Sequence, residues 1–173
     1  MPFLRENEAS SIYFLLERAS LMQHSIIYRL FEPRDQTAVR QLILNRLGEH
    51  YGFIDETRHP DIDDIRENYI STGATFLVAQ LNEQIVGTGG LFEEEPNIGR
   101  IVRMSVDHVY RRHGIGRTII QHLIEVARQR GYIQLRLETN NDWYSVIAFY
   151  TSLGFIVDQW TAHNVHMSMV LRT

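Results

Sequence analysis

The chain has 173 residues, of which 44% are hydrophobic and 22% charged, a composition typical of a single globular domain. Cysteine is absent, which excludes a disulfide framework, a thiol nucleophile and cysteine-bound zinc, and fits a reducing cytoplasm. The net charge of −4 argues against nucleic acid as a partner, and no apolar run reaches the roughly 20 residues that cross a membrane.

The first 24 residues predict an amphipathic helix ahead of the compact domain. Its apolar residues recur at helical spacing, at Ile12, Leu15, Leu16, Ala19 and Met22. Because its apolar run is short and is flanked by acidic residues, we do not expect a signal peptide. Residues 1–24 are therefore expected to form a helical extension and a possible homodimer contact, and residues 25–173 to form one domain.

Strands and helices alternate along the rest of the chain. The predicted strands, rich in β-branched and aromatic residues, cover residues 25–31, 75–81, 85–92, 98–106, 133–139, 155–160 and 165–171. The predicted helices begin at Asp35, Pro60, Ile115 and Asp142, and they end at Gly48, Ser71, Gly131 and Gly154. This order predicts a single α/β domain.

A glycine loop with clustered cations joins the strand at 98–106 to the helix that follows. It reads Arg111-Arg112-His113-Gly114-Ile115-Gly116-Arg117. Glycine allows an anion to approach the backbone N–H groups closely. The helix N-terminus adds unpaired donors and the positive end of the helix dipole, and arginine adds charge-assisted bonds to phosphate. The loop predicts an anion site, although solvated arginines beside a glycine turn are the alternative.

Three short motifs follow one another along the second half of the chain. They are Arg103-Met104-Ser105-Val106, then Arg111-x-x-Gly114-x-Gly116, then Phe149-Tyr150-x-x-Leu153-Gly154-Phe155. Together they resemble the landmarks of the GNAT superfamily of acetyltransferases, and the predicted elements fit that family from Ser25 to Leu171. The resemblance implies an α/β (α+β) fold with a mixed, mostly antiparallel sheet of about six to seven strands and about four helices. The sheet is expected to splay between its fourth and fifth strands.

The resemblance implies acetyl-CoA as the cosubstrate, without a metal. In the family the pantetheine arm lies along the fourth strand, which implies backbone contacts from Met104, Ser105 and Val106. The pyrophosphate is expected on Arg111, Arg112, His113, Gly114, Ile115, Gly116 and Arg117. An N–H of Val106 or Met104 is the expected oxyanion donor. None of the eight histidines has the spacing of a zinc motif.

One cofactor contact departs from the family pattern. Where many members have an asparagine that holds the pantetheine, this chain has Trp143. Asn141 or Asn140 is the expected substitute, and a role as turn residue or helix cap is the alternative.

The implied reaction is direct attack of a neutral amine on the thioester in a ternary complex. Tyr150 matches the family's tyrosine general acid, and packing of the last helix on the sheet is its alternative role. The glutamate base of histone-type members does not carry over, because Arg100 occupies its place. Glu138 is our first candidate for the base, and residues 93–95 or a water chain are the alternatives.

The acceptor is the least determined part. A primary amine of a small molecule is the leading expectation. The alternatives are a protein or peptide N-terminus, or a non-catalytic acyl-CoA-binding module that regulates a partner. The family places the acceptor wall on the first two helices, where Tyr51, Phe53, Tyr69 and Asp61 are found.

Overall fold

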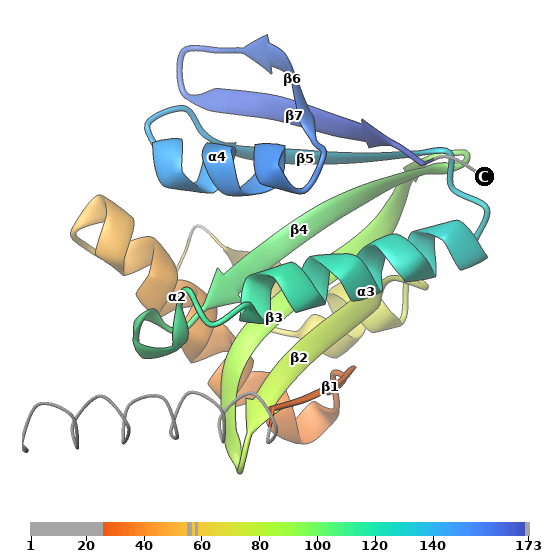
Figure 1. Ribbon diagram of the computed structural model, residues 1–173. Coiled ribbons are helices and arrows are strands. Elements are labelled where there is room, and N and C mark those ends of the chain that lie inside the picture. Colours follow the sequence, from red (N-terminus) through yellow and green to blue (C-terminus); the bar gives the residue numbers. More distant parts are fainter. Residues whose placement is uncertain (1–25, 55–56, 58, 172–173) are drawn as a thin grey trace, which may run out of the picture.

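The computed structural model describes residues 26–54, 57 and 59–171. Within these residues, seven strands form one sheet in the order β1-β2-β3-β4-β5-β7-β6 (Figure 1). Neighbouring strands are antiparallel except β4 and β5, which are parallel. The strands are β1 (Ile26–Leu30), β2 (Thr75–Leu81), β3 (Gln84–Glu95), β4 (Ile98–Val106), β5 (Gln134–Asn140), β6 (Ile156–Trp160) and β7 (Asn164–Val170). The predicted extension at residues 1–24, with its homodimer contact, lies outside the described residues.

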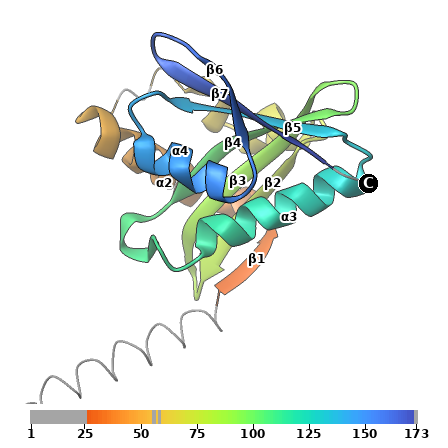
Figure 2. The ribbon, with the colours of Figure 1, turned by 45° about the horizontal axis from the view of Figure 1, so that its top comes forward.

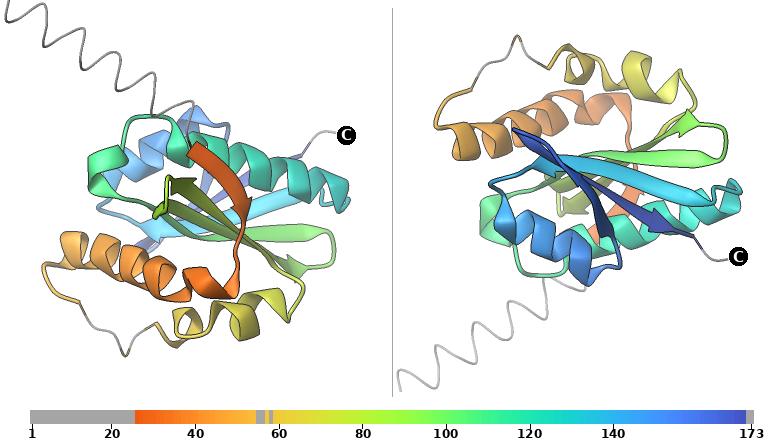
Figure 3. Two further views of the ribbon diagram at one scale, coloured as in Figure 1. Left: turned by 90° about the horizontal axis from the view of Figure 1, so that it is seen from below. Right: turned by 90° about the horizontal axis from the view of Figure 1, so that it is seen from above.

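The helices cover both faces of the sheet. They are α2 (Gln36–Tyr51), α3 (Ile115–Gln129) and α4 (Tyr144–Ser152), with short turns at η1 (Pro33–Asp35), η3 (Pro60–Ile62), η4 (Arg66–Ile70) and η5 (His108–Tyr110). Figure 2 shows α3 and α4 side by side on one face, and Figure 3 shows α2 and η4 across the sheet from α3. The mixed α/β fold with a mostly antiparallel sheet is confirmed.

Helix α3 presses closely on β3 because β3 carries glycines at the contact. The apolar stripe predicted for this helix is buried, at Ile115, Ile119, Ile120, Leu123, Ile124 and Ala127. A Cβ atom at Gly89 would lie 2.6 Å from Cγ2 of Ile119, and one at Gly87 would lie 2.9 Å from its Cδ1. Helix α3, whose N-terminus ends the anion loop, therefore has little room to shift on the sheet.

The sheet divides after a short parallel contact. Strand β4 pairs with β5 only through residues 98–100, opposite residues 134–136. Beyond Arg100 and Arg136 the two strands separate, so one edge of β4 has no strand partner from Ile101 onward. This is the predicted splay between the fourth and fifth strands.

A β-bulge interrupts β4 inside the splay. Thr88 pairs with Ser105 and Gly90 with Val102, so two residues of β4 lie opposite the single residue Gly89. Arg103 has φ of 53°, a conformation that is uncommon for residues with a side chain. Thr88 Oγ1 donates to the Arg103 carbonyl at 2.8 Å and holds the bulge in place.

Two predicted helix boundaries and one predicted helix are wrong. Helix α2 does not end at Gly48 but continues to Tyr51, and Gly52 ends it with φ of 75°. Asp142 does not cap α4; Trp143 occupies that position, and the Asp142 carboxylate faces His50 instead. The helix expected from Pro60 to Ser71 is two short turns, η3 and η4.

Candidate active site

A cavity of about 220 Å³ lies in the splay between β4 and β5. It is closed by α2 on one side and by α4 on the other, so four elements distant in sequence contribute to it. Its lining includes four of the predicted site residues, namely Met104, Ser105, Glu138 and Tyr150.

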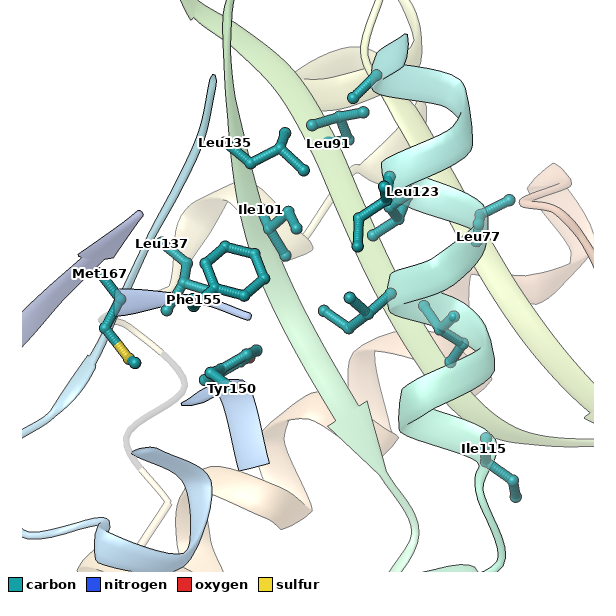
Figure 4. Close-up of a cluster of buried hydrophobic side chains, with 14 of the residues drawn as sticks. Leu77, Leu91, Ile101, Ile115, Leu123, Leu135, Leu137, Tyr150, Phe155 and Met167 are labelled. Atoms are coloured by element: carbon teal, nitrogen blue, oxygen red, sulfur yellow. The ribbon is translucent and has the colours of Figure 1, made fainter. Parts of the chain in front are cut away.

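Tyr150 of α4 is the most deeply placed titratable group in this cavity. Figure 4 shows its side chain beside Phe155, in the space between β4 and the C-terminal strands. The residue is 6% exposed, and within the described chain its hydroxyl makes no hydrogen bond. Burial raises its pKa above the usual value for tyrosine, and the nearby Arg46 guanidinium opposes this only in part. The phenol therefore stays protonated at neutral pH and can donate its proton.

Thr139 of β5 is a cavity residue that the sequence did not single out. Its Oγ1 is buried without a hydrogen-bond partner, and it is the one such side-chain atom within the described residues. Because an unsatisfied buried hydroxyl is costly, this atom suits a polar group of a bound ligand. No sequence signal marked it, because a threonine on a buried strand is ordinary.

Glu138 lines the same cavity from the neighbouring position of β5. Its carboxylate accepts a hydrogen bond from Asn164 Nδ2 at 2.5 Å and lies 3.4 Å from His166 Nδ1. The side chain is 37% exposed, so water reaches it. The position is compatible with the predicted role of base.

The competing candidates for the base lie elsewhere. Residues 93–95 border a second hollow of about 1030 Å³, formed by the β3–β4 hairpin and η4. Glu94 pairs there with Arg100 and with Arg136, which counters the charge of the carboxylate. None of the predicted cofactor-binding residues borders this larger hollow. The smaller cavity is therefore the one that brings the candidate chemistry together.

The anion loop leads from the end of β4 into α3. Gly114 is the N-cap of α3 with φ of 82°, and a Cβ there would meet nothing within 4 Å, so backbone conformation is what demands glycine. Arg112 also has positive φ, of 63°. Arg111 pairs with Glu49 of α2, and its Nε donates to the Val106 carbonyl at 3.0 Å.

The remaining loop residues lie at the start of α3. Arg117 donates to Ser152 Oγ at 3.0 Å, while Arg112 and His113 are exposed. A Cβ atom built on Gly116 would lie 3.5 Å from the side chains of Phe149 and Val106. Ile115 is buried, so only its backbone can reach a ligand. The loop thus presents exposed cations and a helix N-terminus on one side of the splay.

Asn141 is placed away from the cavity. Its side-chain amide donates to the carbonyls of Thr161 and Ala162, at 3.2 and 2.8 Å, and ties β5 to the β6–β7 turn. Neighbouring Asn140 does line the cavity and donates to the Tyr51 hydroxyl at 2.7 Å. A pantetheine contact from Asn141 stays a prediction.

The other three residues of the expected acceptor wall behave differently from Tyr51. The Tyr69 hydroxyl donates to Asp61 at 2.5 Å, and Arg103 also donates to Asp61. Burial, with the Asp61 hydrogen bond added, raises the pKa of Tyr69 to about 12. Phe53 is 59% exposed beside Tyr51. Of the four expected wall residues, Tyr51 therefore lines the cavity, while Tyr69 and Asp61 lie outside it and contact β4 through Arg103.

Two negative findings concern the described part of the chain. None of its helices is long and apolar enough to cross a membrane. It also contains no group of three or more His, Asp or Glu side chains arranged to hold a metal ion.

Comparison with known proteins defines the class. Residues 39–155 match the acetyltransferase (GNAT) family. Human N-acetyltransferase 8B is 33% identical over 109 residues, which cover 60% of this chain and 48% of that protein. Human N-acetyltransferase 8 is 32% identical over the same length. The aligned segment is about half the length of these relatives.

Solved structures show the same fold. A GNAT-family acetyltransferase from Staphylococcus aureus superposes with a TM-score of 0.78 at 24% identity, over 85% of this chain and 99% of that one. The PaiA N-acetyltransferase from Thermoplasma acidophilum, solved in complex with coenzyme A, gives 0.74 at 17% identity over the same shares. These two likenesses show the fold, and the match of residues 39–155 shows the family. The chain belongs to the GNAT family of acetyltransferases.

Proposed function

We propose that this protein transfers the acetyl group of acetyl-CoA to a primary amine of a small molecule, by direct attack with both substrates bound. The observation that carries the proposal is the protonated, unpartnered Tyr150 hydroxyl in a cavity between the separated strands β4 and β5. A family member with this residue in this place has the proton donor that a departing thiolate needs.

The donor binds between α3 and α4. The N–H groups around Gly114 and Gly116, with Arg111, Arg112, His113 and Arg117, hold the pyrophosphate at the start of α3. The free edge of β4 at Met104, Ser105 and Val106 pairs with the pantetheine amides. The Thr139 hydroxyl, which has no partner within the described chain, supplies a further polar contact.

The chain's own groups perform three tasks in the reaction. Glu138 accepts a proton from the incoming ammonium, directly or through water. A backbone N–H of β4, from Val106 or Met104, stabilises the negative charge that develops on the carbonyl oxygen. Tyr150 then protonates the sulfur as the carbon–sulfur bond breaks. Two protons leave the nitrogen in all. Glu138 takes the first and passes it to water, and the second restores the Tyr150 hydroxyl after it has protonated the sulfur, so the products are the amide, the thiol and one released proton.

A small acceptor is supported by the closure of the cavity on the α2 side. The hydrogen bond from Asn140 to Tyr51 joins β5 to α2 across the cavity. A peptide backbone would need an open groove there. The cavity of about 220 Å³ accommodates the reacting end of a small amine.

A panel of amines with detection of released thiol tests the function. It should contain polyamines, amino acids, aminoglycosides and short peptides, each with acetyl-CoA. Thiol release with small amines supports the proposal, and release with peptides alone contradicts the small-molecule assignment. Binding of acetyl-CoA without thiol release from any amine would favour the non-catalytic module.

A further inference from the structure

Arg46 is a cationic side chain that the proposed chemistry leaves without a task. It lies on α2 and lines the splay cavity together with Tyr150. Its side chain is 21% exposed, and its guanidinium carbon lies 4.4 Å from the centroid of the Trp143 ring. A charged group in this position costs desolvation energy, so its presence calls for an explanation.

The positive charge of Arg46 is only weakly balanced by the protein. The nearest carboxylate is Glu49 at 3.7 Å, and Glu49 is shared with Arg111 and lies 3.9 Å from His108. Burial, reinforced by repulsion from Arg111, lowers the pKa of Arg46 in spite of Glu49. Glu138, the carboxylate among the cavity residues, faces His166 and Asn164. A ligand anion would supply the missing charge.

A chain of contacts holds the guanidinium in place. Trp143 donates its indole N–H to His50 Nδ1, and His50 Nε2 lies 3.3 Å from the Asp142 carboxylate. The ring under Arg46 is thus fixed from α2 and from the start of α4. Within the described chain the guanidinium makes no hydrogen bond, and its approach to Glu49 is 3.7 Å, so its N–H groups can pair with a planar, two-oxygen ligand. Trp143, which stands where many family members have asparagine, therefore packs on Arg46.

We propose that Arg46 binds a carboxylate of the acceptor, so that the acceptor is an amino acid or a derivative with a free carboxylate near its amine. This inference rests on the proposed function. A carboxylate fits better than the donor's pyrophosphate, because the loop at the start of α3 already has Arg111, Arg112 and Arg117 for that group. Trp143 acts as a positioning residue for Arg46.

Matched acceptors test the assignment. Each amino acid is assayed beside its carboxamide, which keeps the amine and loses the negative charge. We expect kcat/KM for the acids to exceed that for the amides by roughly 10- to 100-fold, the worth of a charge-assisted pair. Arg46→Gln should remove this preference by raising KM for the acids, while the calorimetric Kd for acetyl-CoA stays within about twofold. Arg128→Gln, which removes an exposed cation on α3, is the matched control.

Three results would overturn the inference. They are equal use of acids and amides by the wild type, an unchanged preference in Arg46→Gln, or a loss of acetyl-CoA affinity in that variant with KM for the acids unchanged. Use of amides alone refutes carboxylate binding and leaves the acetyltransferase function standing. If neither the amino acids nor their carboxamides are acetylated, the inference is refuted. If no other amine of the panel is acetylated either, the proposed function is refuted as well. Trp143→Phe, which keeps the stacked ring, should retain most of the preference.

Discussion

At the scale of single residues, the proposed chemistry depends most on the Tyr150 hydroxyl. Tyr150→Phe removes one oxygen and keeps the ring, which packs against Phe155 with centroids 5.8 Å apart. We expect kcat to fall by roughly 10²- to 10⁴-fold, the usual contribution of general acid catalysis, with the Kd for acetyl-CoA nearly unchanged. Thiol release under saturating acetyl-CoA measures the effect.

The control for this variant is another buried tyrosine of the same apolar cluster. Tyr132 is 7% exposed and does not line the splay cavity. Tyr132→Phe should leave kcat within about twofold. Because burial raises the pKa of Tyr150, the wild-type kcat should not decline through its ionisation below about pH 10. Equal rates for Tyr150→Phe and the wild type would exclude the general acid role.

Gly114 and Gly131 offer a matched pair at opposite ends of α3. Both have positive φ, of 82° and 75°, and a Cβ at either would meet nothing within 4 Å. Replacing either with valine should cost roughly 1–3 kcal/mol of folding stability through backbone strain alone. Only Gly114→Val should also abolish acetyl-CoA binding by calorimetry, because only that end of the helix faces the proposed pyrophosphate site. Intact affinity in Gly114→Val would refute the site.

At the scale of elements, Asp61 ties η3 to the bulged strand β4. Burial alone would raise the pKa of Asp61, but hydrogen bonds from Arg103 and Tyr69 outweigh it and leave the pKa lowered. A lowered folded-state pKa means that the ion pair stabilises the fold above the ordinary Asp pKa of about 3.9, and that this contribution is lost as the pH falls through the folded-state value.

Asp61→Asn should therefore reduce the free energy of unfolding at pH 7, by roughly 1–3 kcal/mol because 33% of the Asp61 side chain is exposed. The difference from the wild type should shrink when urea titrations are repeated near pH 3. Asp63→Asn is the control. It breaks the ion pair of Asp63 with Arg40, and because the Asp63 side chain is 52% exposed, the free energy of unfolding should change little at either pH. A pH-independent deficit in Asp61→Asn would show that charge is not what matters there.

The elements also show what the sequence could and could not predict. Runs of β-branched and aromatic residues located the strands, and helical periodicity located the buried stripe of α3, because both leave a direct trace in the order of residues. Local stop and cap residues gave wrong helix boundaries at positions where tertiary contacts determine the structure. Gly48 continues α2, since Ile54 packs where its side chain would be, with Cγ1 only 2.6 Å from an ideal Cβ. Asp142 faces His50, a residue 92 positions earlier, which no local pattern reveals.

The same limit explains which cavity residues were missed. Motifs pointed to Tyr150, Met104 and the glycine loop because the family keeps them at fixed spacing. Arg46 belongs to none of these motifs, and nothing in the neighbouring sequence distinguishes it from other cations on a helix. Its role follows only from the stack on Trp143, which brings together residues from α2 and the start of α4. The fold determines contacts of this kind between distant residues, and the local sequence around either residue does not indicate them.

At the scale of the whole molecule, the proposed donor site is a local reversal of charge. The chain carries a net charge of −4, while the loop from Arg111 to Arg117 concentrates cations at the N-terminus of α3. Helix α2, which carries Arg46, and helix α3 cover opposite faces of the sheet (Figure 3), and the loop before α3 reaches back to α2 through the ion pair of Arg111 with Glu49.

This arrangement makes donor binding dependent on ionic strength. Acetyl-CoA should raise the melting temperature by mass action, by about 2.7 kcal/mol at 100 times its Kd, or roughly 5–10 °C for a chain of this size. Because the pyrophosphate contacts are charge-assisted and partly exposed, added salt should reduce the shift. An acetyl-pantetheine thioester without pyrophosphate should bind more weakly and show little salt dependence. A shift from acetyl-CoA that is equally large at low and high salt would mean that the pantetheine arm along β4, rather than the cationic loop, provides the binding energy.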